Sequence, residues 1–155
     1  DGYLDPVDSC PREPEDFGHA HGLDLDESLQ VAAWLAEDGL DYLHLSLWDV
    51  RRNTAKRPQE HAISLFRAAL PADLRIVAAG KVWTRADAEA QLDRGADLVA
   101  LGRTATLTPD WPRRAAAGEF TPERGPLTRE QLHALAISDP FVEYLGRFPG
   151  MVRAS

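Results

Sequence analysis

The stretch LRIVAAGKVWTRADAEAQLDRGADLVALGRTATLTPDW, residues 74–111, decides the fold. It holds two short apolar runs, 75–79 and 97–101, and each run stops at a glycine. Runs that are apolar on both faces are typical of parallel strands covered by helices. Residues 85–93 between them predict a helix, which Gly95 ends in a left-handed conformation. The stretch therefore predicts an α/β protein with a parallel sheet.

Gly80 and Gly102 follow the two predicted strands, and Arg103 follows the second glycine. A glycine lets backbone N–H groups approach an anion closely, and the start of a helix adds a partial positive charge. An arginine can bind two phosphate oxygens at once. Two such turns on neighbouring parallel strands predict a phosphate-binding cup, of the kind found after strands seven and eight of a (β/α)8 barrel. Ordinary turn glycines with a surface arginine are the alternative interpretation.

The flanking sequence predicts one more strand and several helices. Residues 24–38 have acidic residues at their start and an apolar face that includes Leu35, which favours a helix. Residues 42–47 predict a strand that places His44 and Ser46 on one face. Further helices are expected over residues 60–70, over residues 128–137 and over residues 139–146. One short helix is expected after Gly102, ending at residue 118.

Three regions are expected along the chain. Residues 1–22 are rich in Asp, Pro and Gly and predict an irregular or disordered arm. Residues 23–120 carry the predicted strands and the phosphate-binding turns. Residues 121–155 predict a linker followed by C-terminal helices.

The composition is that of an ordinary globular protein. Of 155 residues, 44% are hydrophobic and 27% charged, and the net charge of −8 disfavours nucleic acid and anionic membranes as partners. No apolar run approaches the ~18 residues of a membrane span. With Cys10 as the single cysteine, no internal disulfide is possible, so we expect a cytoplasmic location. His19 and His21 lack further ligands at metal-binding spacing, so no metal site is expected.

Six short blocks of the sequence resemble the C-terminal part of the old yellow enzyme family, the FMN-dependent NADH:flavin oxidoreductases and ene-reductases. The blocks are PEDF at 14–17, GLDYLHLS at 39–46, AG at 79–80, ADAE at 86–89, GADLVALGR at 95–103 and PDWP at 109–112. The last two blocks, at this spacing, are specific to the family. The resemblance spans residues 14–112.

The resemblance implies a TIM (β/α)8 barrel of which this chain holds only about strands six to eight. A complete barrel of this type needs ~250 residues, and the chain has 155. An open half-sheet exposes an unpaired edge and its inner face. We therefore expect an oligomer or a companion chain to cover that face.

The resemblance also implies FMN as the cofactor, with NADH or NADPH as the reductant and an activated alkene or quinone-like compound as the substrate. The flavin phosphate would be held by the turns at Ala79, Gly80 and Gly102, together with Lys81 and Arg103. The family's catalytic groups belong to earlier strands, so no catalytic residue is assigned in this chain. The resemblance therefore implies that this chain holds the cofactor-binding part of the enzyme.

Three other residues are candidates for the flavin pocket. Ser46 ends its strand at the mouth of the implied barrel, and Trp48 follows it in a loop with several basic groups. That loop would either meet the phosphates of the reductant or be an ordinary solvated loop. The family carries a flavin-contacting arginine at the position of Pro11, and here Arg12 is displaced from it by one residue.

Three functions remain open. The first is an FMN-dependent oxidoreductase represented by its C-terminal part. The second is a catalytically silent half-barrel that self-associates or binds a phosphorylated ligand. The third is another phosphate-binding barrel enzyme, a lyase or an isomerase, against which the PDWP block argues.

Overall fold

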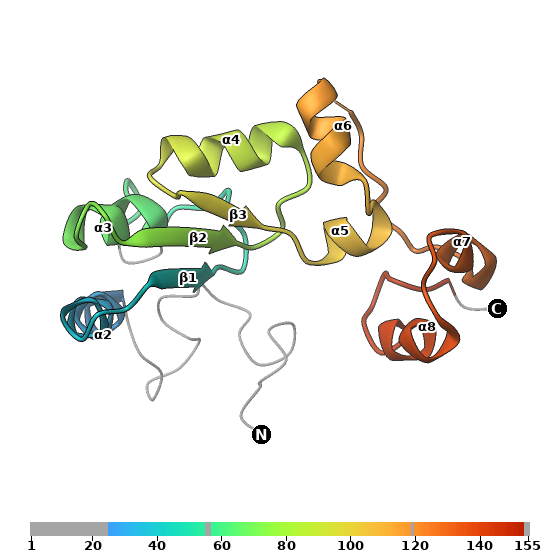
Figure 1. Cartoon of the computed structure of the whole chain (residues 1–155), viewed down its shortest axis with the longest axis horizontal. Coiled ribbons are helices and arrows are strands. Elements are labelled where there is room, and N and C mark those ends of the chain that lie inside the picture. Colours follow the sequence, from blue (N-terminus) through green and yellow to red (C-terminus); the bar gives the residue numbers. More distant parts are fainter. Residues whose placement is uncertain (1–24, 55–56, 119, 154–155) are drawn as a thin grey trace. The chain divides into compact units, whose positions relative to one another are not determined.

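The computed structural model describes residues 25–54, 57–118 and 120–153, so the N-terminal arm expected over 1–22 lies outside the described residues. The elements in chain order are α2 (Leu25–Glu37), β1 (Tyr42–Ser46), α3 (Ala62–Ala69), β2 (Arg75–Ala79), α4 (Arg85–Asp93), β3 (Leu98–Ala100), α5 (Arg103–Leu107), α6 (Trp111–Ala117), α7 (Arg129–Ala134) and α8 (Asp139–Leu145) (Figure 1).

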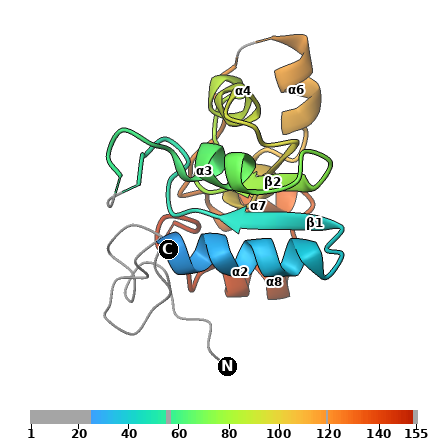
Figure 2. The ribbon, with the colours of Figure 1, turned by 90° about the vertical axis from the view of Figure 1, so that its left-hand side faces the viewer.

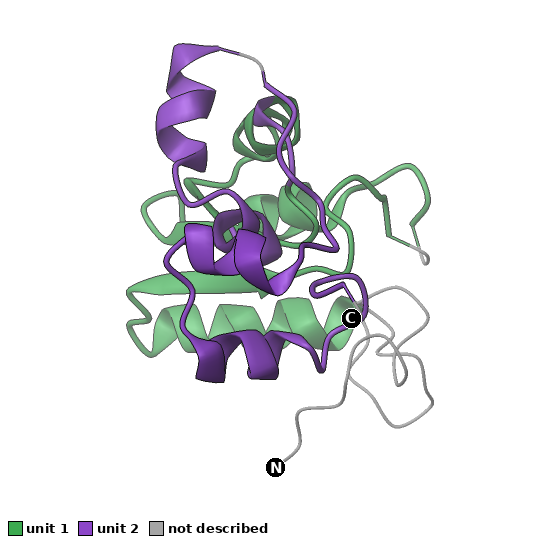
Figure 3. Cartoon of the chain, turned by 90° about the vertical axis from the view of Figure 1, so that its right-hand side faces the viewer, with its two compact units in different colours: residues 1–82, 86–100 green, residues 83–85, 101–155 purple. Residues whose placement is uncertain are grey.

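The chain divides into two compact units (Figure 3). The sheet unit comprises Asp1–Val82 and Ala86–Ala100, and the helical unit comprises Trp83–Arg85 and Leu101–Ser155. The first carries the three strands, α2, α3 and all of α4 except Arg85, and the second carries α5 to α8. Each unit has a hydrophobic core of its own.

The sheet has the strand order β1-β2-β3, and both strand pairs are parallel. Ser46 at the end of β1 lies opposite Ala79, and Ala79 lies opposite Ala100. The strands lie side by side and point the same way in Figure 1, and α2 lies next to β1 there and in Figure 2. The predicted α/β class with parallel strands is confirmed, and the sheet that these strands form is open.

The two faces of the sheet differ because side chains alternate along each strand. Leu45, Ile76 and Ala78 are buried on one face. Tyr42 and Leu98 belong to the other face by strand register, and their side chains are 57% and 58% exposed. Among the described residues, this second face therefore carries large exposed apolar side chains.

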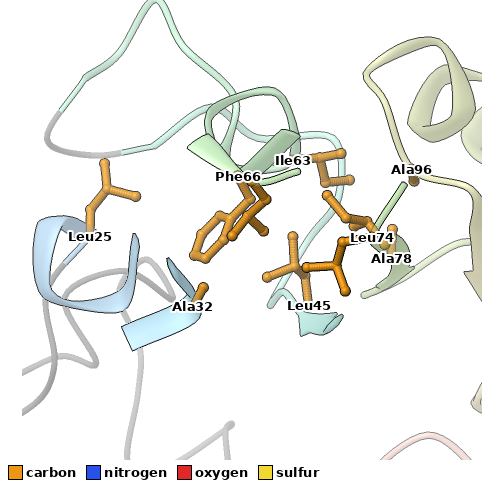
Figure 4. Close-up of a cluster of buried hydrophobic side chains, with 10 residues drawn as sticks. Leu25, Ala32, Leu45, Ile63, Phe66, Leu74, Ala78 and Ala96 are labelled. Atoms are coloured by element: carbon orange, nitrogen blue, oxygen red, sulfur yellow. The ribbon is translucent and has the colours of Figure 1, made fainter. Parts of the chain in front are cut away.

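The core of the sheet unit lies between the sheet and helices α2 and α3 (Figure 4). Phe66 and Ile63 of α3 belong to the same cluster as Leu45 of β1. Leu74 and Ala78 belong to it too, and Ala32 of α2 lies below Phe66. Ile63 and Ile76 are fully buried. Complete burial of such a side chain contributes roughly 1.5–3 kcal/mol, so these apolar positions account for the helix and strand pattern of the sequence.

Asp97, the residue before β3, bonds to residues of β2 and α3. Its carboxylate accepts hydrogen bonds from the Ile76 backbone N–H at 2.9 Å and from Arg75 Nη1 at 2.7 Å, and Arg67 Nη1 lies 3.3 Å away. The Ile76 N–H, followed by the Arg75 side chain, lowers the pKa of Asp97 below its usual value. The carboxylate therefore ties the start of β3 to β2 and to α3.

The helical unit is built around Trp83 and side chains from the C-terminal helices. Its buried residues are Trp83, Leu107, Leu127, Leu132, Ile137, Val142, Leu145 and Met151. Trp111 Nε1 donates a hydrogen bond of 2.7 Å to the carbonyl of Trp83. Thr128 and Gln131 form a complete capping box at the start of α7, which satisfies two backbone N–H groups that a helix leaves unpaired.

Two details differ from the sequence predictions. The single short helix expected after Gly102 is two helices, α5 and α6, because residues 108–110 interrupt it and Pro112 starts a new first turn. Leu35, expected on the buried face of α2, is 42% exposed. None of the described helices combines the length and the apolar character that a membrane span requires.

Candidate functional site

The turn after β2 is packed closely against the end of β1. The Leu47 N–H donates to the Ala79 carbonyl at 2.8 Å, and the Val50 N–H donates to the Gly80 carbonyl at 3.0 Å. Gly80 has a φ of 137°, and a Cβ at this position would lie 2.1 Å from the Leu47 carbonyl oxygen. The fold itself therefore requires a glycine here, independently of any ligand.

Lys81 follows that glycine with a φ of 51°, in the left-handed region that side chains other than glycine seldom adopt. Its ammonium lies 4.3 Å from the centre of the Trp48 ring and 4.0 Å from Asp49 Oδ2. The side chain is 26% exposed. Lys81, Trp48 and Asp49 thus form one cluster at the carboxyl ends of β1 and β2.

Arg51 completes this cluster; the sequence analysis treated it only as one of the basic groups of the loop and did not predict its pairing with Asp49. Its Nε donates to Asp49 Oδ1 at 2.8 Å, its Nη2 to Oδ2 at 2.5 Å, and its backbone N–H to Oδ1 at 3.0 Å. The side-chain hydrogen bond from Arg51 is the main cause that lowers the pKa of Asp49, and the same bond raises the pKa of Arg51. An acid and an arginine two residues apart were the available signal in the sequence.

Arg57 and Asn53 of the same loop have partners within the fold. Arg57 pairs with Asp26 and lies 3.7 Å from Glu60. The Asn53 side chain donates to the Pro58 carbonyl at 2.9 Å. Arg57 is therefore engaged by carboxylates of its own chain.

A buried histidine anchors the same loop. His61 Nε2 lies 2.9 Å from the Val50 carbonyl, and its Nδ1 accepts the N–H of Ile63, which caps α3. Burial lowers the pKa of His61 below its usual value, and the positive charge of Arg94 acts in the same direction. The imidazole is therefore neutral near pH 7 and serves as a structural cap.

The second predicted turn belongs to the helical unit. Gly102 is exposed, has a φ of −94°, and precedes the first residue of α5. A Cβ at Gly102 would meet no atom within 4 Å. Arg103 is exposed directly after it. In contrast to Gly80, no neighbouring atom excludes a side chain at Gly102.

The candidate residues therefore fall into two groups. Ser46, Trp48, Ala79, Gly80 and Lys81 lie in the sheet unit, where Ser46 is exposed at the end of β1 and opposite Ala79. Gly102 and Arg103 lie in the helical unit. Arg12 lies outside the described residues. Within the described ranges, no group of three or more His, Cys, Asp or Glu side chains is arranged to hold a metal ion.

Comparison with known proteins gives three relatives. An NADH:fumarate oxidoreductase of Klebsiella pneumoniae is 35% identical over 103 residues, which are 63% of this chain and 11% of that protein. An NADH:acrylate oxidoreductase of Vibrio harveyi is 30% identical over 129 residues, 80% of this chain and 13% of that protein. A probable NADH-dependent flavin oxidoreductase of Bacillus subtilis is 30% identical over 110 residues, 70% of this chain and 28% of that protein.

The chain thus spans less than a third of the length of each relative. No protein-family model matches it. All three relatives carry NADH-dependent oxidoreductase names, and the resemblance drawn from the short sequence blocks is confirmed. This chain is homologous, over the part that aligns, to NADH:flavin oxidoreductases of the old yellow enzyme type.

Proposed function

We propose that this chain is the FMN-phosphate-binding part of an NADH-dependent flavin oxidoreductase, and that β1, β2 and β3 correspond to strands six to eight of its (β/α)8 barrel. The aligned residues make up 11–28% of the relatives named above, and the oxidoreductase chemistry in their names motivates the assignment. The parallel order of the three strands agrees with three consecutive strands of such a barrel.

The observation that carries the proposal is the turn at Gly102 and Arg103. An exposed guanidinium follows a glycine whose missing Cβ leaves open space. Those are the two requirements for holding a phosphate: backbone N–H groups that an anion can approach, and a cation with several donors. We assign the flavin phosphate to this turn first, and to the turn of Ala79, Gly80 and Lys81 second.

A bound flavin would supply hydride transfer between NADH or NADPH and an activated alkene or quinone-like substrate. The described residues contribute to the binding of such a cofactor. In the helical unit, Arg103 would balance the charge of the phosphate. In the sheet unit, Ser46, Trp48 and Lys81 are the residues proposed to contact the cofactor. We assign no residue of this chain to a catalytic step.

Flavin binding tests the proposal directly. The purified chain is incubated with FMN, freed of unbound flavin by desalting, and examined for absorption near ~450 nm, the usual flavin maximum. Arg103→Ala removes a charge-assisted hydrogen bond that contributes roughly 1.5–3 kcal/mol. We expect FMN affinity to fall by about one to two orders of magnitude.

Arg113→Ala is the matched control. Arg113 is also an exposed arginine of the helical unit, with a side chain that is 83% exposed and an ion pair to Asp110 at 3.0 Å. Such an exposed pair contributes little to stability, so this variant should bind FMN like the unmodified chain. Equal affinity in the Arg103 and Arg113 variants would remove the phosphate role of Arg103.

The exposed sheet face supports the silent half-barrel as the second candidate. Tyr42 and Leu98 are more than half exposed, and such a face in a soluble protein favours association with another surface. On this alternative the chain remains colourless after incubation with FMN. Sedimentation velocity would then show self-association, which Leu98→Asp should abolish.

A further inference from the structure

The ring of Trp48 carries a cation from its own chain. Lys81 Nζ lies over the ring at 4.3 Å from its centre. The face of an indole attracts a cation, and the same face stacks on flat heteroaromatic rings. Because one surface cannot serve both partners at once, a ring that stacks on this face must displace the Lys81 ammonium.

The contacts that hold Lys81 are replaceable. Asp49, the nearby carboxylate, already accepts three hydrogen bonds from Arg51. Lys81 Nζ is 4.0 Å from Asp49 Oδ2, which is beyond hydrogen-bond distance. The charge of Asp87 also acts on Arg51, so the two cations face two carboxylates. Lys81 makes no hydrogen bond to Asp49, so an anion can take its ammonium without breaking one.

The backbone position of Lys81 lets its ammonium move while the turn stays fixed. Its backbone is in the left-handed region, with a φ of 51°, directly after the turn at Gly80. This fixed backbone holds the root of the side chain at the carboxyl ends of β1 and β2, while the four-carbon stem lets the ammonium move. The ammonium can leave the Trp48 ring without any change in the turn.

We propose that the face of Trp48 beneath Lys81 is a subsite for the flat ring of a phosphorylated ligand, and that Lys81 covers this subsite until a phosphate group draws its ammonium away. The inference rests on the proposed function for the identity of the ring, a flavin. The phosphate and the ring then bind in a coupled way, so that a ring without phosphate must displace the lysine unaided.

FMN and riboflavin, which share the ring and differ in the phosphate, separate the two roles. Lys81→Met keeps most of the stem and removes the charge. We expect riboflavin to bind this variant about two- to fivefold tighter, because the cation no longer competes for the ring. FMN should bind about tenfold more weakly, because it loses the partner of its phosphate. Changes in the same direction for both ligands would overturn the inference.

Trp48→Leu is the matched variant for the ring. Loss of stacking should weaken FMN and riboflavin by a similar factor of about ten. A Trp48→Leu chain that keeps its affinity for both ligands contradicts the subsite. Circular dichroism of both variants checks that the fold is retained.

Inorganic phosphate tests, without any flavin, whether the Lys81 ammonium leaves the Trp48 ring when an anion binds. Acrylamide quenching of Trp48 fluorescence, taken as the difference from Trp48→Phe, should increase with phosphate at constant ionic strength and should not change in Lys81→Met. An unchanged quenching in the unmodified chain overturns the inference even if FMN binds. If phosphate uncovers Trp48 but neither flavin binds, the proposed function fails and the lysine cover stands.

Discussion

Replacement of Gly80 by alanine should destabilise the sheet unit severely. The added Cβ would lie 2.1 Å from the Leu47 carbonyl oxygen and 2.8 Å from its carbon, so backbone atoms must move. The φ of 137° is itself unfavourable for alanine, at a cost of roughly 1–3 kcal/mol. Movement would also disturb the hydrogen bonds Leu47 N–H to Ala79 O and Val50 N–H to Gly80 O, each with a net contribution of about 0.5–1.5 kcal/mol.

Together these terms predict a loss of about 3 kcal/mol in the free energy of unfolding. For a chain of this size, 1 kcal/mol corresponds to about 2–4 °C in Tm, so Tm should fall by about 6–12 °C. Urea denaturation followed by far-ultraviolet circular dichroism measures the free energy, and a thermal scan measures Tm.

Gly102→Ala is the comparison for this experiment. No atom lies within 4 Å of the added Cβ, and φ is −94°, so the free energy of unfolding should change by less than about 1 kcal/mol. If Gly102 has the proposed ligand role, FMN binding should nevertheless weaken. A Gly80→Ala chain as stable as Gly102→Ala would refute the steric reasoning.

Two further predictions concern stability in the sheet unit. Asp97→Asn removes the charge that Arg75 and Arg67 contact, and we expect a loss of about 1–2 kcal/mol at pH 7, measured by urea denaturation. Because the pKa of Asp97 is lowered in the fold, its stabilising effect is present above the unfolded pKa and is lost as the pH falls through the folded value. The difference between the two chains should thus shrink below about pH 4, and a constant difference would contradict the ion pairing. For His61, burial lowers the folded pKa, so stability should fall as the pH drops below about 6.5. His61→Gln should flatten that part of the profile, and an unaltered profile would show that another group titrates.

The main elements of the sheet unit were predictable because their signals are local. Residues 75–79 form β2 and residues 85–93 form α4, as the apolar run and the terminating glycines indicated. Gly95 has the expected positive φ of 107°. The predicted strand over 97–101 is shorter, at Leu98–Ala100. The Asp97 side chain contacts β2 and α3, which sequence spacing does not reveal.

The exposure of Leu35 could not be predicted for a related reason. The periodicity of α2 places it near the apolar face, but burial depends on what packs there. Leu25, Leu29, Ala32 and Ala36 of α2 pack in the core of the sheet unit, and Leu35 lies outside that set. The Asp49–Arg51 pair was missed because ion pairs in loops depend on backbone turns. The hydrophobic periodicity of helices and strands can be read from the sequence, whereas side-chain contacts in loops cannot.

The two glycine turns show the same limit at the candidate site. Gly80 and Gly102 give identical sequence signals, a glycine at the end of a strand, yet their surroundings differ. Gly80 is required by the carbonyl of Leu47, a residue 33 positions earlier, whereas no atom lies within 4 Å of a Cβ at Gly102. A glycine that the fold already explains is weak support for a ligand. The phosphate assignment therefore depends on Gly102 and Arg103, and the turn at Gly80 contributes through Lys81, whose ammonium lies beyond hydrogen-bond distance of the Asp49 carboxylate.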